Sequence, residues 1–299
     1  MTSVSRQLGH PGASRSGGQR PLGRPARPAL SRAVGHWSLW LGIAILALLT
    51  VSPLAWMIST SFKRASEVYG TTLVPPHPTV GNFVYVFTQV PFVRYIINSA
   101  LVAAVVTVVA LIFHSMAGYA LARLRFPGRD VIFTVIFATL LVSVPVILVP
   151  LFLVAKQLHL LNSYAGLIVP SIFNAFGIFF LRQFYIALPT DLEDAAFVDG
   201  CGYWRVYRHV VLPLSRPLLG ALAVFFFLAN WNAFLWPLTI TQNPNLWMIQ
   251  LGIANFQTQY AAAWNYAMAA STVAALPTLA LFFIFQRQLV ETIKISGGR

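Results

Sequence analysis

Charge is scarce in this sequence. Asp, Glu, Lys and Arg make up only 9% of its 299 residues, whereas a soluble domain carries about 25%. Hydrophobic residues account for 58% of the chain, and the mean hydropathy is +0.72. This composition argues against a soluble globular protein and predicts one that is embedded in a membrane.

Cysteine and the residues of metal or nucleotide chemistry are also sparse. Cys201 is the single cysteine, so no internal disulfide can form. The six histidines lack the short spacings of metal ligands, and the three lysines lie outside any GxxxxGK[ST] sequence. We therefore expect no metal or cofactor on this chain and no ATP hydrolysis by it. His114, at membrane depth, is expected to be neutral and hydrogen-bonded to a neighbouring helix.

Long intervals without a charged residue fill most of the chain. A helix needs about 20 apolar residues to cross a bilayer, and no segment alternates as a barrel strand does. The sequence therefore predicts an all-α integral membrane protein with six transmembrane helices. The predicted spans are Trp37–Ile58, Ile96–Arg123, a proline-kinked helix within Val131–Ala155, Ala165–Leu188, Leu218–Ile240 and Met268–Leu289.

The basic residues indicate how these spans are oriented. With six crossings, one face receives sixteen of the twenty Lys and Arg residues, and cytoplasmic loops are enriched in them. Both termini are therefore predicted to be cytoplasmic, and the net charge of +13 needs no nucleic-acid partner. Residues 1–32 are expected to form a disordered basic tail that could contact anionic membrane lipid, and residues 33–299 the transmembrane domain.

One polar segment, Leu188–Pro217, interrupts the hydrophobic spans and holds four of the seven acidic residues. Thr190 and Glu193 have the spacing of a capping box, which predicts a short helix that starts there. Asp199-Gly200 predicts a turn, and a second helix over Tyr203–Val211 is expected to stop at Leu212-Pro213. The residues alone leave two possibilities equally open, a solvated amphipathic element or a docking surface for another protein.

This segment resembles the EAA loop of ABC-importer permeases, which reads approximately E-A-A-x-x-x-D-G-A with a later L-P. The positions that match are Glu193, Ala195, Ala196, Asp199, Gly200, Leu212 and Pro213. Asp194 is inserted after the glutamate, and Cys201 replaces a small residue.

Further segments resemble the carbohydrate-uptake subgroup, in particular its maltose-type second permease subunit. They are Tyr95–Ser99, Ala120–Arg123 with Phe126–Gly128, Trp231-Asn232, and Pro277 through Arg287. The likeness covers Leu41 to Ile295. The family's glycine- and lysine-containing end is altered here, which puts any contact of that tail with an ATPase in doubt.

The resemblance implies a set of partners in the cytoplasmic membrane. They are a second homologous permease, a dimer of ABC ATPases that uses ATP and Mg²⁺, and an extracytoplasmic solute-binding protein. It also implies that the short helix between spans 4 and 5 is a cytoplasmic coupling helix that docks in a cleft of the ATPase. Glu193 and Asp199 are its expected polar anchors, and at Gly200 a side chain is expected to clash or to stiffen the turn.

The substrate pathway is expected to be uncharged, because the spans are expected to contain no Asp, Glu, Lys or Arg. Such a pathway suits a neutral polar solute and argues against ion-coupled transport. Amide and indole groups that suit a sugar are Asn98, Asn174, Asn230, Trp231, Asn232 and Trp236. The alternative for each is that it bridges helices or lies at the membrane interface.

The sequence thus favours a permease subunit that imports a mono- or oligosaccharide or a polyol by alternating access. One alternative is import of a phosphorylated polyol such as glycerol phosphate. Another is a membrane-embedded glycan or lipid transferase whose acids hold Mg²⁺. Glu193 and Asp199 are six residues apart and do not easily share a helix face, which disfavours the enzyme.

Overall fold

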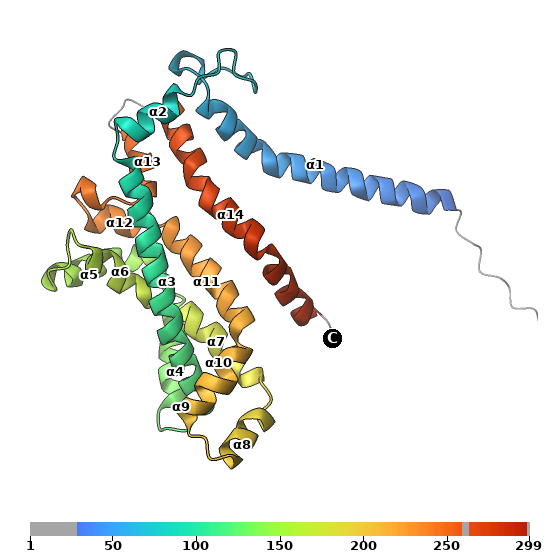
Figure 1. The fold of residues 1–299 in the computed structure, drawn as a ribbon, viewed down its shortest axis with the longest axis vertical. Coiled ribbons are helices and arrows are strands. Elements are labelled where there is room, and N and C mark those ends of the chain that lie inside the picture. Colours follow the sequence, from blue (N-terminus) through green and yellow to red (C-terminus); the bar gives the residue numbers. More distant parts are fainter. Residues whose placement is uncertain (1–28, 259–262, 298–299) are drawn as a thin grey trace, which may run out of the picture. The chain divides into compact units, whose positions relative to one another are not determined.

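The computed structural model describes residues 29–258 and 263–297, and this part of the chain is helical without any strand (Figure 1). It forms two units, residues 1–53 and 54–299. Of the first unit, the structure describes residues 29–53, which belong to α1. The tail was predicted over residues 1–32. Residues 1–28 of it lie outside the described residues, and residues 29–32 belong to α1, which begins at Ala29. The fourteen α-helices described are α1 Ala29–Ser61, α2 Gly81–Thr88, α3 Phe92–Arg123, α4 Arg129–Thr139, α5 Val144–Gln157, α6 Tyr164–Ile172, α7 Ala175–Ala187, α8 Asp191–Val198, α9 Tyr203–Val206, α10 Leu212–Leu214, α11 Arg216–Trp231, α12 Leu235–Ile240, α13 Ile249–Thr258 and α14 Trp264–Gly297.

Four helical segments are long and apolar enough to cross a membrane. They are Leu39–Ser61, Phe92–Arg123, Tyr164–Ala187 and Trp264–Phe285. Two further pairs qualify only when a sharp bend is included. One pair joins α4 to α5 at 105°, and the other joins Tyr203–Leu214 to α11 at 75°. Six crossings result if each bent pair is a single span.

The third predicted span differs most from expectation. A single kinked helix was expected within Val131–Ala155, but α4 ends at Thr139 and α5 starts at Val144 in a new direction. Pro145 lies in the first turn of α5, where its missing N–H costs nothing. Pro145 therefore lies at the start of α5 and does not kink a continuous helix.

The fifth predicted span, Leu218–Ile240, is also divided. Helix α11 ends at Trp231 and α12 begins at Leu235. Pro237 explains the interruption, because in an unbroken helix its ring would collide with the carbonyl of Ala233. The polar Asn232 therefore lies at a helix end.

Helix α3 is the centre of the second unit and packs against α6, α7 and α11. Figure 1 shows α2 and α13 at one end of α3 and α8 and α9 at the other. His114, in the middle of α3, is buried, and the backbone N–H of Asn174 donates to its Nε2 atom at 3.3 Å. The expected hydrogen bond between this histidine and a neighbouring helix is confirmed.

Candidate functional site

Helix α8 lies near the end of α3 that is remote from α2 (Figure 1). It carries acidic residues in its first turn. Asp191, Asp194 and Ala195 are exposed, and Val198 is 88% exposed. These positions recur three and four residues apart, so they share one side of the helix. The opposite side, Ala196 and Phe197, packs into a hydrophobic cluster with the helices above it. A protein partner of α8 would therefore meet three carboxylates, since Asp199 is exposed as well.

Glu193, the expected polar anchor for the ATPase, lies on the packed side of α8. Its Oε1 atom is 2.7 Å from Nε of Arg123, and only 8% of its side chain is exposed. The hydroxyl of Tyr119 donates to the other carboxylate oxygen at 3.4 Å. The carboxylate therefore forms an ion pair within the chain, and it neutralises the guanidinium of Arg123, which is also largely buried.

The capping box predicted at Thr190 is also wrong. Thr190 already has helical angles, φ −70° and ψ −28°, and its side chain makes no capping hydrogen bond. The N–H groups of Glu193 and Asp194 donate instead to the backbone oxygen of Thr190. Three acids in the first turn still stabilise α8 through the helix dipole.

Two arginines tie the ends of α3 and α7 to each other. Arg123 of α3 donates through Nη2 to the carbonyl of Leu188, just beyond α7, at 2.7 Å. Arg182 of α7 donates through Nε to the carbonyl of Leu121 in α3 at 3.2 Å. Each cation thus reaches the carboxyl end of the other helix, where the helix dipole favours positive charge. This corrects the expectation that the spans are free of charge, because Arg182 lies inside the segment Tyr164–Ala187.

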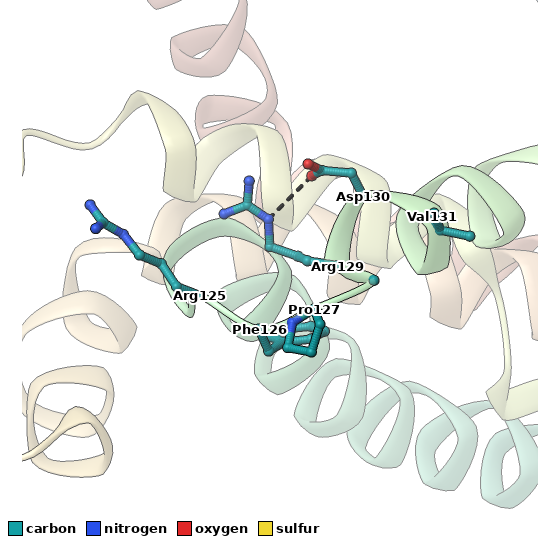
Figure 2. A pocket seen from close by; sticks show the side chains of 7 residues that line it. Arg125, Phe126, Pro127, Arg129, Asp130 and Val131 are labelled. Atoms are coloured by element: carbon teal, nitrogen blue, oxygen red, sulfur yellow. Dashed lines mark hydrogen bonds and ion pairs between the residues drawn. The ribbon is translucent and has the colours of Figure 1, made fainter.

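The turn between α3 and α4 belongs to the same region (Figure 2). Gly128 takes a φ of +82°, which reverses the chain after Pro127. Residues 125–131 line a pocket there, in which Arg129 pairs with Asp130 at 3.2 Å while Arg125 points away from the pair. Asp130 also lies 3.7 Å from Arg182, so the turn is linked to α7.

Gly200 ends α8 with a φ of +79°. Its N–H donates to the carbonyl of Phe197, and the N–H of Cys201 donates to the carbonyl of Ala196. These two bonds are those of a Schellman motif, which strongly favours glycine at this position. An added Cβ would meet nothing within 4 Å, so of the two expected effects, a clash and a stiffer turn, the described residues produce no clash. The backbone conformation is what requires glycine.

Leu212-Pro213 does not stop the second helix as expected. The chain continues from α9 through a π-helical turn, Tyr207–Val211, into α10 and bends only at Ser215. The N–H of Leu212 donates to the carbonyl of Tyr207, five residues back. This wider turn shifts the hydrogen-bonding register ahead of Pro213, which has no N–H to donate.

Most of the predicted pathway residues have structural partners instead. The Nδ2 group of Asn98 donates to the carbonyls of Asn245 and Trp247, and its Oδ1 accepts from Tyr164. Trp231 and Trp236 are buried and donate to the backbone carbonyls of Ala274 and Gly166. These three side chains thus connect segments that are distant in the sequence.

The remaining three pathway candidates are asparagines at or near helix ends. Asn174 caps α7 by accepting from the N–H of Phe176, and Asn230 donates to the carbonyl of Phe226 within its own helix. Asn232 is exposed, and its Oδ1 accepts from Nε2 of Gln250 at 2.9 Å. Of the six predicted residues, Asn232 alone lines a described polar groove.

The sequence of residues 114–295 matches the model of a family described as the binding-protein-dependent transport system inner membrane component. The chain belongs to this family. It is therefore a permease subunit of the inner membrane, and the prediction of an ABC-importer permease is confirmed.

Relatives that match more than two thirds of the permease support the same conclusion. It is 34% identical over 279 residues to an arabinooligosaccharide transport system permease of Halalkalibacterium halodurans, covering 92% of this chain and 98% of that one. It is 36% identical over 217 residues to the sn-glycerol-3-phosphate transport system permease of Yersinia enterocolitica, covering 72% and 75%. A bacterial ABC transporter for alginate import has a chain with the same fold, with a TM-score of 0.76 at 21% identity over 88% of this permease and 99% of that chain.

Sequence reasoning missed several residues of this permease that the structure brings forward. Neither Arg123 nor Arg182 was expected to form a contact between helices, although each falls near the end of a predicted span. Gln250, Ser271 and Thr278 join Asn232 in its groove. The spacing of Ser271 and Thr278, seven residues on one helix face, is the signal that could have found them.

Proposed function

We propose that this permease is one of two membrane subunits of an ABC importer that carries a neutral carbohydrate into the cell. It crosses the membrane six times, with each bent pair counted as one crossing, and both termini lie in the cytoplasm. The positive-inside rule supports this orientation, because sixteen of the twenty basic residues then lie on one side. Residues 188–217, with α8, fall on that cytoplasmic side.

Helix α8 is the coupling helix of this proposal, and the observation that carries it is the division of its two faces. The inner face is fixed by Glu193, whereas the outer face offers Asp191, Asp194 and Ala195 to solvent. A short acidic helix with small residues at its centre fits a cleft with basic edges. The partner we assign to it is the dimer of ABC ATPases, which binds ATP and Mg²⁺.

The contacts of α8 indicate how its movement would reach the membrane. A pull on α8 acts on Glu193 and hence on Arg123 at the end of α3. Arg123 also holds the carbonyl of Leu188, so α7 moves with α3. Since α3 packs against α6, α7 and α11, a rotation of its end is transmitted to the packed core. Alternating access through this core, together with the second permease, is the transport mechanism we infer.

A neutral sugar is the cargo that the groove at Asn232 suits best. Its described lining contains amide and hydroxyl groups and no charged side chain. A phosphorylated polyol would need cationic groups to balance its phosphate. The arabinooligosaccharide relative agrees with the sugar, and the glycerol phosphate relative keeps the phosphorylated cargo as the alternative to be tested.

The test is a mild-detergent pull-down of the tagged permease from native membranes, followed by mass spectrometry and uptake assays. Recovery of a Walker-motif ATPase, a second permease and a solute-binding protein is expected. Proteoliposomes of that complex should then import a neutral sugar in an ATP-dependent manner. Import of sn-glycerol 3-phosphate in preference to arabinotriose and lactose would replace the proposed cargo.

A membrane-embedded transferase is the outcome to be expected if the chain is recovered alone and acts alone. The described residues give this alternative little support. Glu193 is engaged by Arg123, and no group of three His, Cys, Asp or Glu side chains converges within the described part of the chain. Catalytic activity of the purified chain without an ATPase would nevertheless overturn the proposal.

A further inference from the structure

A groove with four polar lining residues lies between the end of α11, helix α13 and helix α14, and Leu54 of α1 also lines it. Its volume is about 250 Å³. The polar groups that line it are uncharged: the amides of Asn232 and Gln250 and the hydroxyls of Ser271 and Thr278. Small and aliphatic side chains, including Ala274 and Ala275, form the rest of the lining. The groove is therefore shaped by small residues of α14 and edged by hydrogen-bonding groups.

The hydroxyls of Ser271 and Thr278 differ from that of Thr272 in the same helix. Thr272, also in α14, donates to the carbonyl of Met268 at 2.8 Å, which is the usual use of a threonine inside a helix. Ser271 and Thr278 have no hydrogen-bond partner among the residues that the structure describes. Both line the groove, so their hydroxyls are available to a solute there.

The amide pair has spare capacity as well. Nε2 of Gln250 donates to Oδ1 of Asn232, and Nδ2 of Asn232 donates to the carbonyl of Leu228. This orients the pair, but a glutamine amide has two donors and two acceptor lone pairs. No described residue donates a hydrogen bond to Oε1 of Gln250, which remains an acceptor for a hydroxyl. The pair is thus held in place by one contact and open to another.

The size of the groove fits a polyhydroxyl ring. Ser271 and Thr278 are seven residues apart on α14, which corresponds to about 10 Å along the helix axis. Alternating donors and acceptors over that length match the hydroxyls of one or two sugar units, while Ala274 and Ala275 suit the C–H face of a ring. Resting on the proposed function, we infer that this groove binds the transported sugar, with Gln250 and Thr278 as its principal contacts.

The experiment compares isosteric variants in proteoliposomes that contain the complete transporter and its binding protein. The double variant Gln250→Leu with Thr278→Val removes two hydrogen-bonding groups, and Thr272→Val is the matched control on the same helix. Uptake is measured with arabinotriose, lactose and sn-glycerol 3-phosphate as probes, and ATP hydrolysis stimulated by the binding protein is measured in parallel.

For the sugar that the unaltered transporter imports, the double variant should lower the uptake rate about four- to hundredfold, since each lost hydrogen bond is worth about two- to tenfold. Stimulated ATP hydrolysis should stay within about twofold of the unaltered rate, and the control should match it in both assays. Ala275→Phe, which fills the groove and removes no hydrogen bond, should also block uptake.

Two results would overturn the inference while the proposed function stands. One is full sugar uptake by the double variant. The other is an equal loss of uptake and of stimulated hydrolysis, which would indicate a structural role for these residues. If the unaltered transporter imports neither neutral sugar, the proposed cargo fails and the inference fails with it.

Discussion

The guanidinium of Arg123 and the carboxylate of Glu193 lie 2.7 Å apart, with 13% and 8% of their side chains exposed. This ion pair joins the end of a long membrane helix, α3, to the short helix α8 that we assign to ATPase docking. The residues are 70 positions apart in the sequence, so only the tertiary fold brings them together. The pair is the most direct connection between the two helices.

Loss of one member of this pair should destabilise the permease strongly. Glu193→Leu leaves Arg123 buried without its partner, which costs about 3–5 kcal/mol, whereas the double replacement by Leu should cost less than either single one. Thermal unfolding of the purified complex measures the coupling between the two sites. Asp194→Asn, on the exposed side of the same helix, is the control for stability. It should leave unfolding within about 0.5 kcal/mol of the original and weaken ATPase co-purification.

The turn at Gly200 should tolerate a side chain less well than the neighbouring turn at Gly202. Gly200 has a φ of +79°, whereas Gly202 has a φ of −79°, and an added Cβ meets nothing within 4 Å at either position. Gly200→Ala should therefore cost about 1 kcal/mol through the backbone and reduce uptake, and Gly202→Ala should change little. Gly200→Asn should be milder than Gly200→Ala because asparagine accepts this conformation. Equal uptake by the Gly200→Ala and Gly202→Ala variants would contradict this account.

Close packing around His114 predicts a further sensitive position. A Cβ at Gly177 would overlap the ring of His114 and lie 2.7 Å from Phe226, so α3, α7 and α11 would have to separate. Gly177→Ala should cost about 1–3 kcal/mol, seen as a lower midpoint of thermal unfolding. Gly42, whose added Cβ meets nothing within 4 Å, provides the control. Gly42→Ala is expected to leave that midpoint unchanged or slightly raised.

The segment between α1 and α2 contains a pH-dependent contact. Nδ1 of His77 lies 2.7 Å from Oε1 of Glu67, and this hydrogen bond lowers the pKa of the carboxyl group below its usual value. A lowered folded-state pKa stabilises the segment above the unfolded pKa of about 4.3. That contribution is lost as the pH falls through the lower folded-state value.

Carbon-13 labelling of the chain's three glutamates can test this contact by NMR in nanodiscs. The carboxyl signal of Glu67 should titrate below pH 4.3 in the unaltered permease. In His77→Gln, which also identifies the signal, the titration should move upward. An unchanged midpoint in that variant would show that His77 does not set it.

Much of the fold follows from hydropathy. Intervals without charge predict the spans that correspond to α1, α3, α6 with α7, and α14. A membrane span must form its backbone hydrogen bonds internally and expose apolar side chains to lipid. The two spans that contain Pro145 and Pro237 were predicted less well. Hydropathy reports that a segment is apolar, but the position at which a proline falls in a turn decides whether a helix bends, breaks or begins.

The acidic segment shows the same limit for function. Its composition and its resemblance to the EAA loop were enough to identify the family and to place a short helix at the correct residues. They assigned Glu193 to a partner protein, yet the carboxylate turns inward. Which side of an eight-residue helix faces the body depends on groups such as Arg123 and Tyr119, which come from another part of the chain.

The sequence by itself therefore determined the membrane setting, the family and the position of α8, since each depends on local composition and spacing. Tertiary structure alone decided which polar side chains are engaged and which remain free. Asn98, Trp231 and Trp236 donate hydrogen bonds to backbone carbonyls of residues distant in the sequence. Gln250, Ser271 and Thr278 instead line one groove. A buried polar group must find a partner, and that partner is a neighbour in space and not in sequence.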